Sequence, residues 1–155
     1  MRTLLTKALV ALAITTVVAF GADNSIGTWK LNVEKSKYTP APMPIKSLTS
    51  TREAMEGGAK VTTTGVQADG TPINSTAAVK YDGKDTKVTG APWDTIAVKQ
   101  VDANTFTAVT KQTNGKYNAT GRTVISKDGK TMTTTTKGTN AEGQPFSASL
   151  VYDKQ

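Results

Sequence analysis

The segment that decides the fold reads Ile73-Asn74-Ser75-Thr76-Ala77-Ala78-Val79-Lys80-Tyr81-Asp82-Gly83-Lys84. Every second residue from Ile73 to Tyr81 is apolar or small, and this period of two is typical of a β-strand with one buried face. Asp82-Gly83 then supplies the positive φ that a tight hairpin turn requires. A strand followed by such a turn predicts an antiparallel sheet.

The same combination recurs along the chain. The residues from Phe146 to Tyr152 alternate in the same way, and runs such as Thr133–Thr136 favour a pleated sheet because β-branched side chains are stiff. No window after Phe20 has an apolar period of 3.6. The turn signals stand at 56–58, 68–70, 82–84, 102–104, 114–115, 127–129 and 141–143. The sequence therefore predicts an all-β protein.

Between these turns, strands are expected at 27–32, 46–55, 59–67, 72–81, 85–89, 93–101, 105–113, 116–126, 130–137 and 145–153. Short turns predict that strands adjacent in sequence pair, which gives an antiparallel up-and-down meander of eight to ten strands. Closing that meander into a barrel removes its two unpaired edges. Residues 33–46, with prolines at 40, 42 and 44, are expected to be extended and polyproline-like, packed across the barrel surface or over one end.

The N-terminal residues have the pattern of a secretory signal. Arg2 and Lys7 precede the apolar run Ala8–Phe20, and Ala19-Phe20-Gly21 offers small residues for cleavage. We expect a cleaved signal peptide at 1–21, a single domain at 22–155 and a secreted or periplasmic protein without a lipoprotein cysteine. The run falls short of the roughly 20 residues of a membrane-spanning helix, so the mature form is expected to have no transmembrane segment. A retained N-terminal anchor is the alternative.

The chain contains neither Cys nor His, which excludes many catalytic classes. Disulfides, thiolate nucleophiles, Ser-His-Asp triads and the common zinc sites all need one of these residues. The carboxylates mostly stand beside turn glycines, where Asp is an ordinary turn former. We therefore expect no catalytic residues, no metal and no cofactor. A glycosidase pair of Asp94 with Glu53 or Asp102 is the alternative that the sequence leaves open.

The net charge of +7 does not predict nucleic-acid binding. The lysines after the signal fall singly between threonines and turns, without a cluster or a row of interleaved aromatic residues. Such scattered charge favours solubility, or a weak contact with an anionic envelope surface.

Gly27-Thr28-Trp29 begins the first expected strand, and a Gly-x-Trp at that place resembles the lipocalin and wider calycin families. A closer similarity is to small secreted bacterial proteins of lipocalin-like type, a mostly uncharacterised family. The segments that carry it are Gly27–Asn32, Lys35–Tyr38 with the prolines that follow, Tyr81–Lys84 and Ser126–Thr133. The resemblance covers nearly the whole chain after the signal and implies a lipocalin-like β-barrel.

In lipocalins this tryptophan closes the base of the barrel and is covered by an arginine from the last strand. The resemblance therefore implies that Gly27 and Trp29 are structural. The last expected strand contains no arginine, so we expect Arg122, from an earlier strand, to cover Trp29 by cation–π stacking.

The expected interior is lined by small side chains. The candidate inward positions are Ser75, Ala77, Thr95, Ala97, Ala108, Thr110, Ala119, Gly121, Thr134 and Ala148. A barrel lined in this way leaves volume for a ligand, whereas a flattened barrel with a fine-grained core is the alternative. The aromatic residues expected to wall the cavity are Tyr81, Trp93, Phe106, Tyr117, Phe146 and Tyr152.

The sequence thus predicts an exported, non-enzymatic barrel that binds or carries a small hydrophobic or amphipathic molecule. The competing hypothesis is a cell-envelope interaction or structural module without an internal ligand, which uses its threonine-rich faces.

Overall fold

The computed structural model describes residues 22–155, and every regular element in that range is a β-strand. The strands are β1 (Gly27–Thr39), β2 (Ile45–Met55), β3 (Gly58–Gln67), β4 (Pro72–Lys80), β5 (Asp82–Lys87), β6 (Thr95–Asp102), β7 (Thr105–Lys111), β8 (Asn118–Ile125), β9 (Thr131–Thr139) and β10 (Pro145–Lys154). The all-β prediction is confirmed. The expected signal peptide lies outside the described residues.

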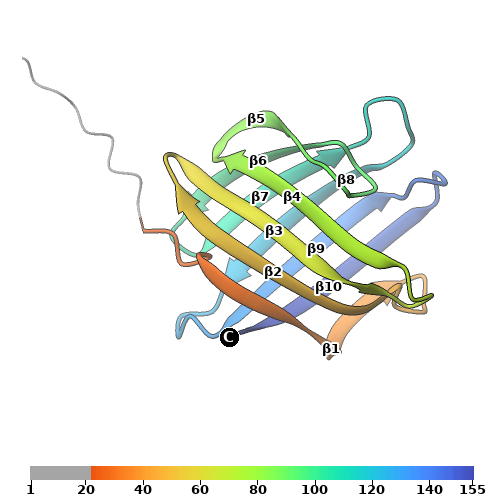
Figure 1. Ribbon diagram of the computed structural model, residues 1–155, viewed down its shortest axis with the longest axis horizontal. Coiled ribbons are helices and arrows are strands. Elements are labelled where there is room, and N and C mark those ends of the chain that lie inside the picture. Colours follow the sequence, from red (N-terminus) through yellow and green to blue (C-terminus); the bar gives the residue numbers. More distant parts are fainter. Residues whose placement is uncertain (1–21) are drawn as a thin grey trace, which may run out of the picture.

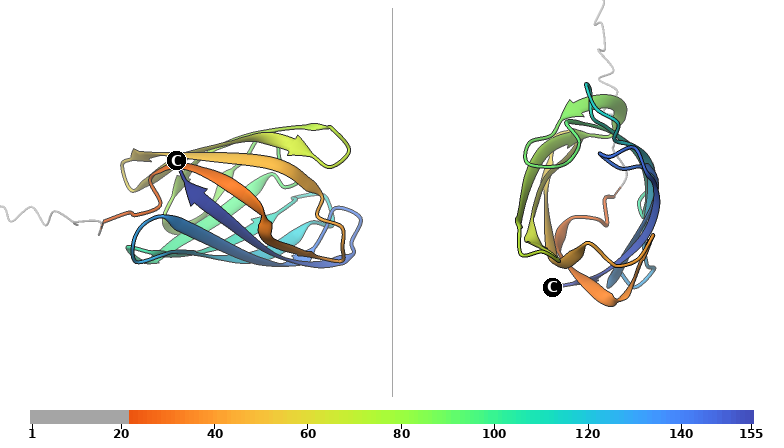
Figure 2. Two further views of the ribbon diagram at one scale, coloured as in Figure 1. Left: turned by 90° about the horizontal axis from the view of Figure 1, so that it is seen from below. Right: turned by 90° about the vertical axis from the view of Figure 1, so that its right-hand side faces the viewer.

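All ten strands belong to one antiparallel sheet in the order β4-β3-β2-β1-β10-β9-β8-β7-β6-β5. Strand β1 pairs with both β2 and β10 and so joins the two halves of the chain into one sheet, which curls around until its ends at β4 and β5 face each other (Figure 1). Seen end-on, the strands enclose an oval outline (Figure 2). The predicted meander and barrel are confirmed, with ten strands at the upper end of the expected range.

The barrel is nearly closed at a seam between β4 and β5. Thr76 and Thr89 exchange two backbone hydrogen bonds there, with N···O distances of 3.1 and 3.2 Å. Gly90 follows with a φ of +78°, and a Cβ at this position would overlap the carbonyl oxygen of Asn74. A glycine is needed because the connection after β5 approaches the β4 backbone so closely.

The expectation for residues 33–46 is wrong over its first half. Strand β1 continues to Thr39 and pairs with β10 again after a bulge between Asn32 and Lys37. Within the bulge, the Ser36 hydroxyl donates to the Asn32 carbonyl (2.7 Å) and accepts from the Val151 amide (2.9 Å). The Ser36 side chain thus replaces backbone partners that are missing in the bulge. This lets β1 continue through residues 33–36, where the sequence shows no clear alternation. Only residues 40–44 form an irregular connection.

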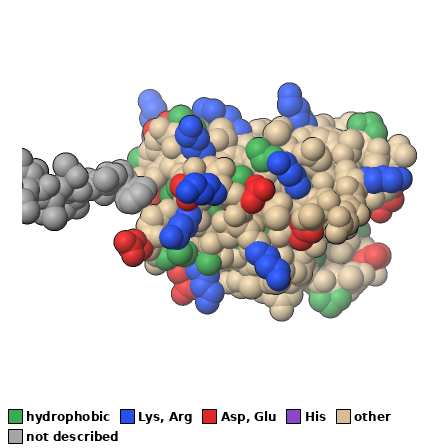
Figure 3. Space-filling view, turned by 90° about the horizontal axis from the view of Figure 1, so that it is seen from above, with side chains coloured by type: hydrophobic (Ala, Val, Ile, Leu, Met, Phe, Trp, Pro, Cys, Tyr) green, Lys and Arg blue, Asp and Glu red, His purple; other side chains and the backbone are tan. Residues whose placement is uncertain are grey.

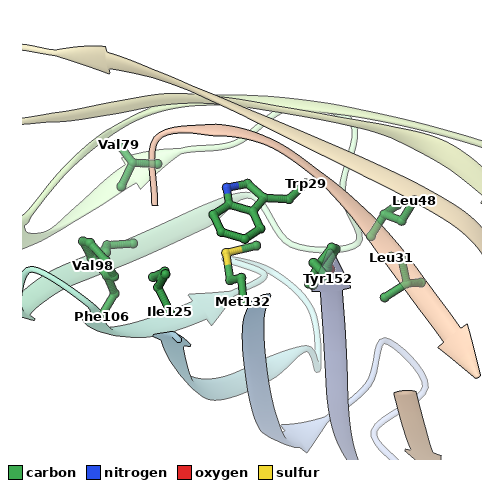
Figure 4. Packing of buried hydrophobic residues seen from close by; sticks show 9 residues of the cluster. All are labelled: Trp29, Leu31, Leu48, Val79, Val98, Phe106, Ile125, Met132 and Tyr152. Atoms are coloured by element: carbon green, nitrogen blue, oxygen red, sulfur yellow. The ribbon is translucent and has the colours of Figure 1, made fainter. Parts of the chain in front are cut away.

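The two ends of the barrel differ. We call the end with the turns at 56–57, 103–104 and 126–130 the base, and the end with the connections at 40–44, 88–94, 112–117 and 140–144 the mouth. The hydrophobic core lies toward the base. Its buried members are Trp29, Leu31, Leu48, Val79, Val98, Phe106, Ile125, Met132 and Tyr152. Figure 4 shows the Trp29 ring above the Met132 sulfur, with side chains from seven other strand positions around them.

Residues 22–26 cross the base before β1 begins, as the view from the mouth shows (Figure 2). The Asn24 amide donates to the Ala103 carbonyl (3.1 Å), and the Asn24 side chain donates to Asn104 (2.7 Å). Ser25 is fully buried, and its carbonyl accepts from Trp29 Nε1 at 2.7 Å. The N-terminal segment therefore plugs the base. Within residues 22–155, no helix is long and apolar enough to cross a membrane.

Candidate ligand-binding interior

The strand pairings decide which side chains face the interior. On β6 and β7, Val98 pairs with Ala108 and Gln100 pairs with Phe106, and both Val98 and Phe106 are buried in the core. Ile96, Val98 and Gln100 therefore face inward. The expected inward positions Thr95 and Ala97 are wrong, because they lie on the opposite face of β6. The segment from Thr95 to Val98 has small or apolar residues in both phases, so its alternation could not be read from the sequence.

The other expected inward positions do face inward, and most are only partly buried. They are Ser75, Ala77, Ala108, Thr110, Ala119, Gly121, Thr134 and Ala148, of which only Ala119 is buried. Thr63, Thr123 and Thr136 share these inward faces. Between the base cluster and the mouth, the inward faces thus carry many small side chains and hydroxyl groups, together with the partly buried Ile73, Ile96 and Leu150, which pack against the core. Small side chains contribute less volume there than the Leu, Ile and Phe that fill an ordinary core.

Four aromatic side chains form a row at the mouth. The ring centroids of Trp93 and Tyr117 are 5.1 Å apart, those of Tyr117 and Phe146 are 5.9 Å apart, and those of Phe146 and Tyr38 are 5.8 Å apart. Three of the four are predicted cavity residues. Tyr38 was missed, because β1 was expected to end before it.

The remaining predicted cavity residues lie at the base. Tyr81 packs against Phe106 with ring centroids 5.1 Å apart. Phe106 is 3% exposed and Tyr152 is 7% exposed, and both belong to the core around Trp29. The structure therefore splits the predicted set: Trp93, Tyr117 and Phe146 rim the mouth, whereas Tyr81, Phe106 and Tyr152 close the far end.

Trp29 is completely buried, and the cation beside it is Lys154. Lys154 Nζ lies 5.1 Å from the ring centroid, and its strand, β10, pairs with β1. A Cβ on Gly27 would come within 2.9 Å of Lys154 Cε, so this glycine leaves room for the lysine stem. The prediction that Arg122 covers Trp29 is wrong. Arg122 pairs with Thr107 and Thr135 on the outer face of β8 and is exposed.

Arg52 is an inward-facing residue that the sequence reasoning missed. It follows Leu48 and Ser50 on the inward face of β2, and that phase is the signal that could have found it. Its Nε is buried and has no hydrogen-bond partner among the described residues. Burial lowers the pKa of Arg52, while the nearby Tyr81, Tyr152 and Asp23 oppose that shift. The Arg52 guanidinium inside the barrel wall is thus stabilised by the nearby Asp23 carboxylate without forming a direct ion pair with it.

Asp23 brings the opposite charge into the base. Its carboxylate accepts from the Tyr81 hydroxyl at 2.6 Å and from the Ser25 amide and hydroxyl at 2.8 and 2.6 Å. Burial, and then the hydrogen bond to Asp23, raise the pKa of Tyr81 well above its usual value. The Tyr81 proton therefore stays in place and ties the end of β4 to the N-terminal plug.

The carboxylates proposed for a glycosidase pair have other neighbours. Asp94 accepts from the backbone amide and the hydroxyl of Thr113, at 3.0 and 2.8 Å, and so joins two connections at the mouth. Asp102 accepts from the Asn104 amide at 2.8 Å in the β6–β7 turn. Among residues 22–155, no group of three or more Asp or Glu side chains is arranged to hold a metal ion.

No family model matches the chain, and no curated protein matches it by sequence. Among solved structures, it is similar to a zebrafish ileal bile acid-binding protein complexed with cholic acid. The TM-score is 0.48 at 12% sequence identity, and the match covers 86% of this chain and 100% of that chain. A similarity of this size assigns neither a family nor a ligand.

Proposed function

We propose that this chain binds one small, mostly apolar or amphipathic molecule inside its barrel and carries it without transforming it. The observation that carries the proposal is the large share of small, partly buried side chains on the inward faces between the base core and the aromatic row at the mouth. Burying apolar ligand surface there would contribute about 25 cal/mol per Å². Thr110, Thr134 and their neighbours would orient a polar end by hydrogen bonding.

We further propose that the protein is exported and that it is a member of the small lipocalin-like proteins of bacteria. Both proposals depend on sequence features, namely the basic and apolar N-terminal segment and the Gly27-Thr28-Trp29 motif. The Trp29 environment supports the second proposal, since Lys154 from the last strand covers the ring at the place where the resemblance implies an arginine.

Filling the interior tests the binding proposal. Ala77 and Ala78 are neighbours on β4, but Ala77 faces inward and is partly buried whereas Ala78 faces outward and is exposed. We expect Ala77→Leu to weaken binding of the fluorescent probe anilinonaphthalene sulfonate at least tenfold, roughly 1.4 kcal/mol. Ala78→Leu, the matched control, should stay within about twofold by that same measure.

Thermal unfolding gives an independent reading of the same pair. If the interior has room, Ala77→Leu will leave the melting temperature unchanged or raise it. A filled core would instead lose about 1–3 kcal/mol to overpacking. Destabilisation by Ala77→Leu, together with no probe binding by the unsubstituted protein, would contradict the proposal.

A further inference from the structure

The outer face of β8, β9 and β10, together with the end of β1, carries a depression of about 620 Å³. Its floor includes the backbone at Gly121 and Ala148, two small residues at inward positions of β8 and β10. Its walls consist of outward side chains from the four strands. We call this depression the outer groove. It lies on the opposite side of the sheet from the proposed ligand site and does not depend on it.

Strand register arranges the groove in two rows. The first row crosses the strands through Arg122, Thr135, Ser149 and Lys37, each directly opposite the next. The second row crosses through Thr120, Lys137, Ser147 and Thr39 in the same way. Each row therefore places hydroxyl groups between or beside cations. This order could not be read from the sequence, because it depends on the β1 bulge, which sets the register of Lys37 and Thr39.

The charge of the groove has one sign. Arg122, Lys137 and Lys37 line it, and no Asp or Glu of residues 22–155 does. Among the described residues, the one ion pair joins Lys35 to Asp153, and neither residue lines the groove. Another face of the molecule, in Figure 3, instead mixes Lys and Arg with Asp and Glu. The groove is thus a local concentration of unpaired positive charge on a chain whose lysines are otherwise scattered.

The spacing of the cations matches an extended ligand rather than a single small anion. With strands about 4.8 Å apart and alternate residues about 6.8 Å apart, the Cα atoms of Arg122 and Lys137 lie about 8 Å from each other. Those of Lys137 and Lys37 lie about 12 Å apart by the same geometry. A single carboxylate or phosphate would have to draw all three long side chains together, whereas a chain with repeated negative groups can pair with each cation at its own place on the sheet.

We propose that the outer groove binds an anionic polysaccharide, with Arg122, Lys137 and Lys37 pairing its charges. The Ser and Thr hydroxyls favour this occupant, because they can exchange hydrogen bonds with sugar hydroxyls along both rows. A nucleic acid is disfavoured because the groove offers no aromatic side chain among its described residues for base stacking. A membrane is disfavoured because a flat lipid surface does not fit a depression.

The test measures binding of the full-length protein to polygalacturonate, an acidic polysaccharide, at moderate ionic strength. The groove variant replaces Lys37, Arg122 and Lys137 by Gln. The matched control replaces Lys60, Lys80 and Lys99 by Gln, since these exposed lysines lie on β3, β4 and β6, outside the groove. We expect the groove variant to bind at least tenfold more weakly and the control to stay within about twofold, a difference of roughly 1 kcal/mol or more.

A second variant separates sugar recognition from charge alone. Thr135→Val with Ser149→Ala removes two hydroxyls and keeps all three cations, and it should weaken polygalacturonate binding severalfold. An unchanged affinity would show a bare polyanion site and overturn the proposal. Equal losses in the groove variant and the lysine control would overturn it too. So would tighter, groove-dependent binding to vesicles of phosphatidylglycerol or to a single-stranded oligonucleotide.

Discussion

Trp29 shows how one residue organises the base of the barrel. Its indole nitrogen donates to the Ser25 carbonyl, its ring lies on Met132 in the core, and Lys154 covers its outer side. The N-terminal plug, the core and the last strand are thus joined through one side chain. Gly27 belongs to the same arrangement, since its φ of +130° favours glycine and a Cβ there would come within 2.9 Å of Lys154 Cε.

Replacing Lys154 tests this arrangement. Lys154→Met keeps an unbranched stem over the ring but removes the charge, so we expect a loss of about 0.5–1 kcal/mol in the free energy of unfolding. Trp29 emission should also shift, because the nearby cation is gone. Arg122→Met is the control, since Arg122 lies on the outer face of β8. Equal destabilisation by both substitutions, measured by urea unfolding, would mean that Lys154 does not stabilise Trp29.

At the scale of elements, the barrel depends on two irregular places. The β1 bulge keeps a long first strand paired with β10 although one side chain, Ser36, has to stand in for backbone partners. The seam between β4 and β5 is held by the hydrogen bonds of Thr76 with Thr89 and by the close packing of Gly90. Neither place follows the regular alternation, and together they set the register of the outer groove and the closure of the interior.

Gly90→Ala tests the seam. This substitution adds a steric overlap with the Asn74 carbonyl to the cost of a positive φ. Gly70→Ala is the matched control, because Gly70 has a φ of +90° but a Cβ at this position would meet no other atom within 4 Å. We expect Gly70→Ala to cost about 1–2 kcal/mol from its φ alone and Gly90→Ala to cost clearly more.

Hydrogen exchange locates the damage. In the Gly90→Ala variant, the amides of Thr76 and Thr89 should exchange faster, while those of the β1–β10 pair stay protected. A uniform rise in exchange across all ten strands would argue against a local seam.

At the scale of the whole molecule, the barrel is filled unevenly. Its base is packed with Trp29, Met132, Phe106 and Tyr152, whereas many of the inward positions in its middle are alanine, serine or threonine. The base therefore contributes most of the buried core, while the proposed binding site lies nearer the mouth. The packed base gives a chain without disulfides a hydrophobic core that can hold the fold.

The packed base predicts loss of stability at high pH. Burial raises the pKa of Tyr152 to about 12, whereas a tyrosine in an unfolded chain ionises near pH 10. The neutral phenol therefore stabilises the fold fully below pH 10, and this contribution of up to about 3 kcal/mol is lost as the pH rises toward 12. Because Tyr152→Phe cannot ionise, its stability should fall less steeply between pH 10 and 12. Parallel pH profiles of the two proteins in urea unfolding would contradict the prediction.

The sequence by itself determined the all-β class, the meander and most strand bounds. These follow from local rules: side-chain alternation with a period of two, and glycines at hairpin turns. Tertiary structure alone decided the phase of β6, the length of β1 and the split of the aromatic residues between base and mouth. It also replaced Arg122 by Lys154 over Trp29 and revealed Arg52 inside the wall. The reason is register: which residues meet across a barrel depends on bulges and closure, and these act between strands distant in sequence.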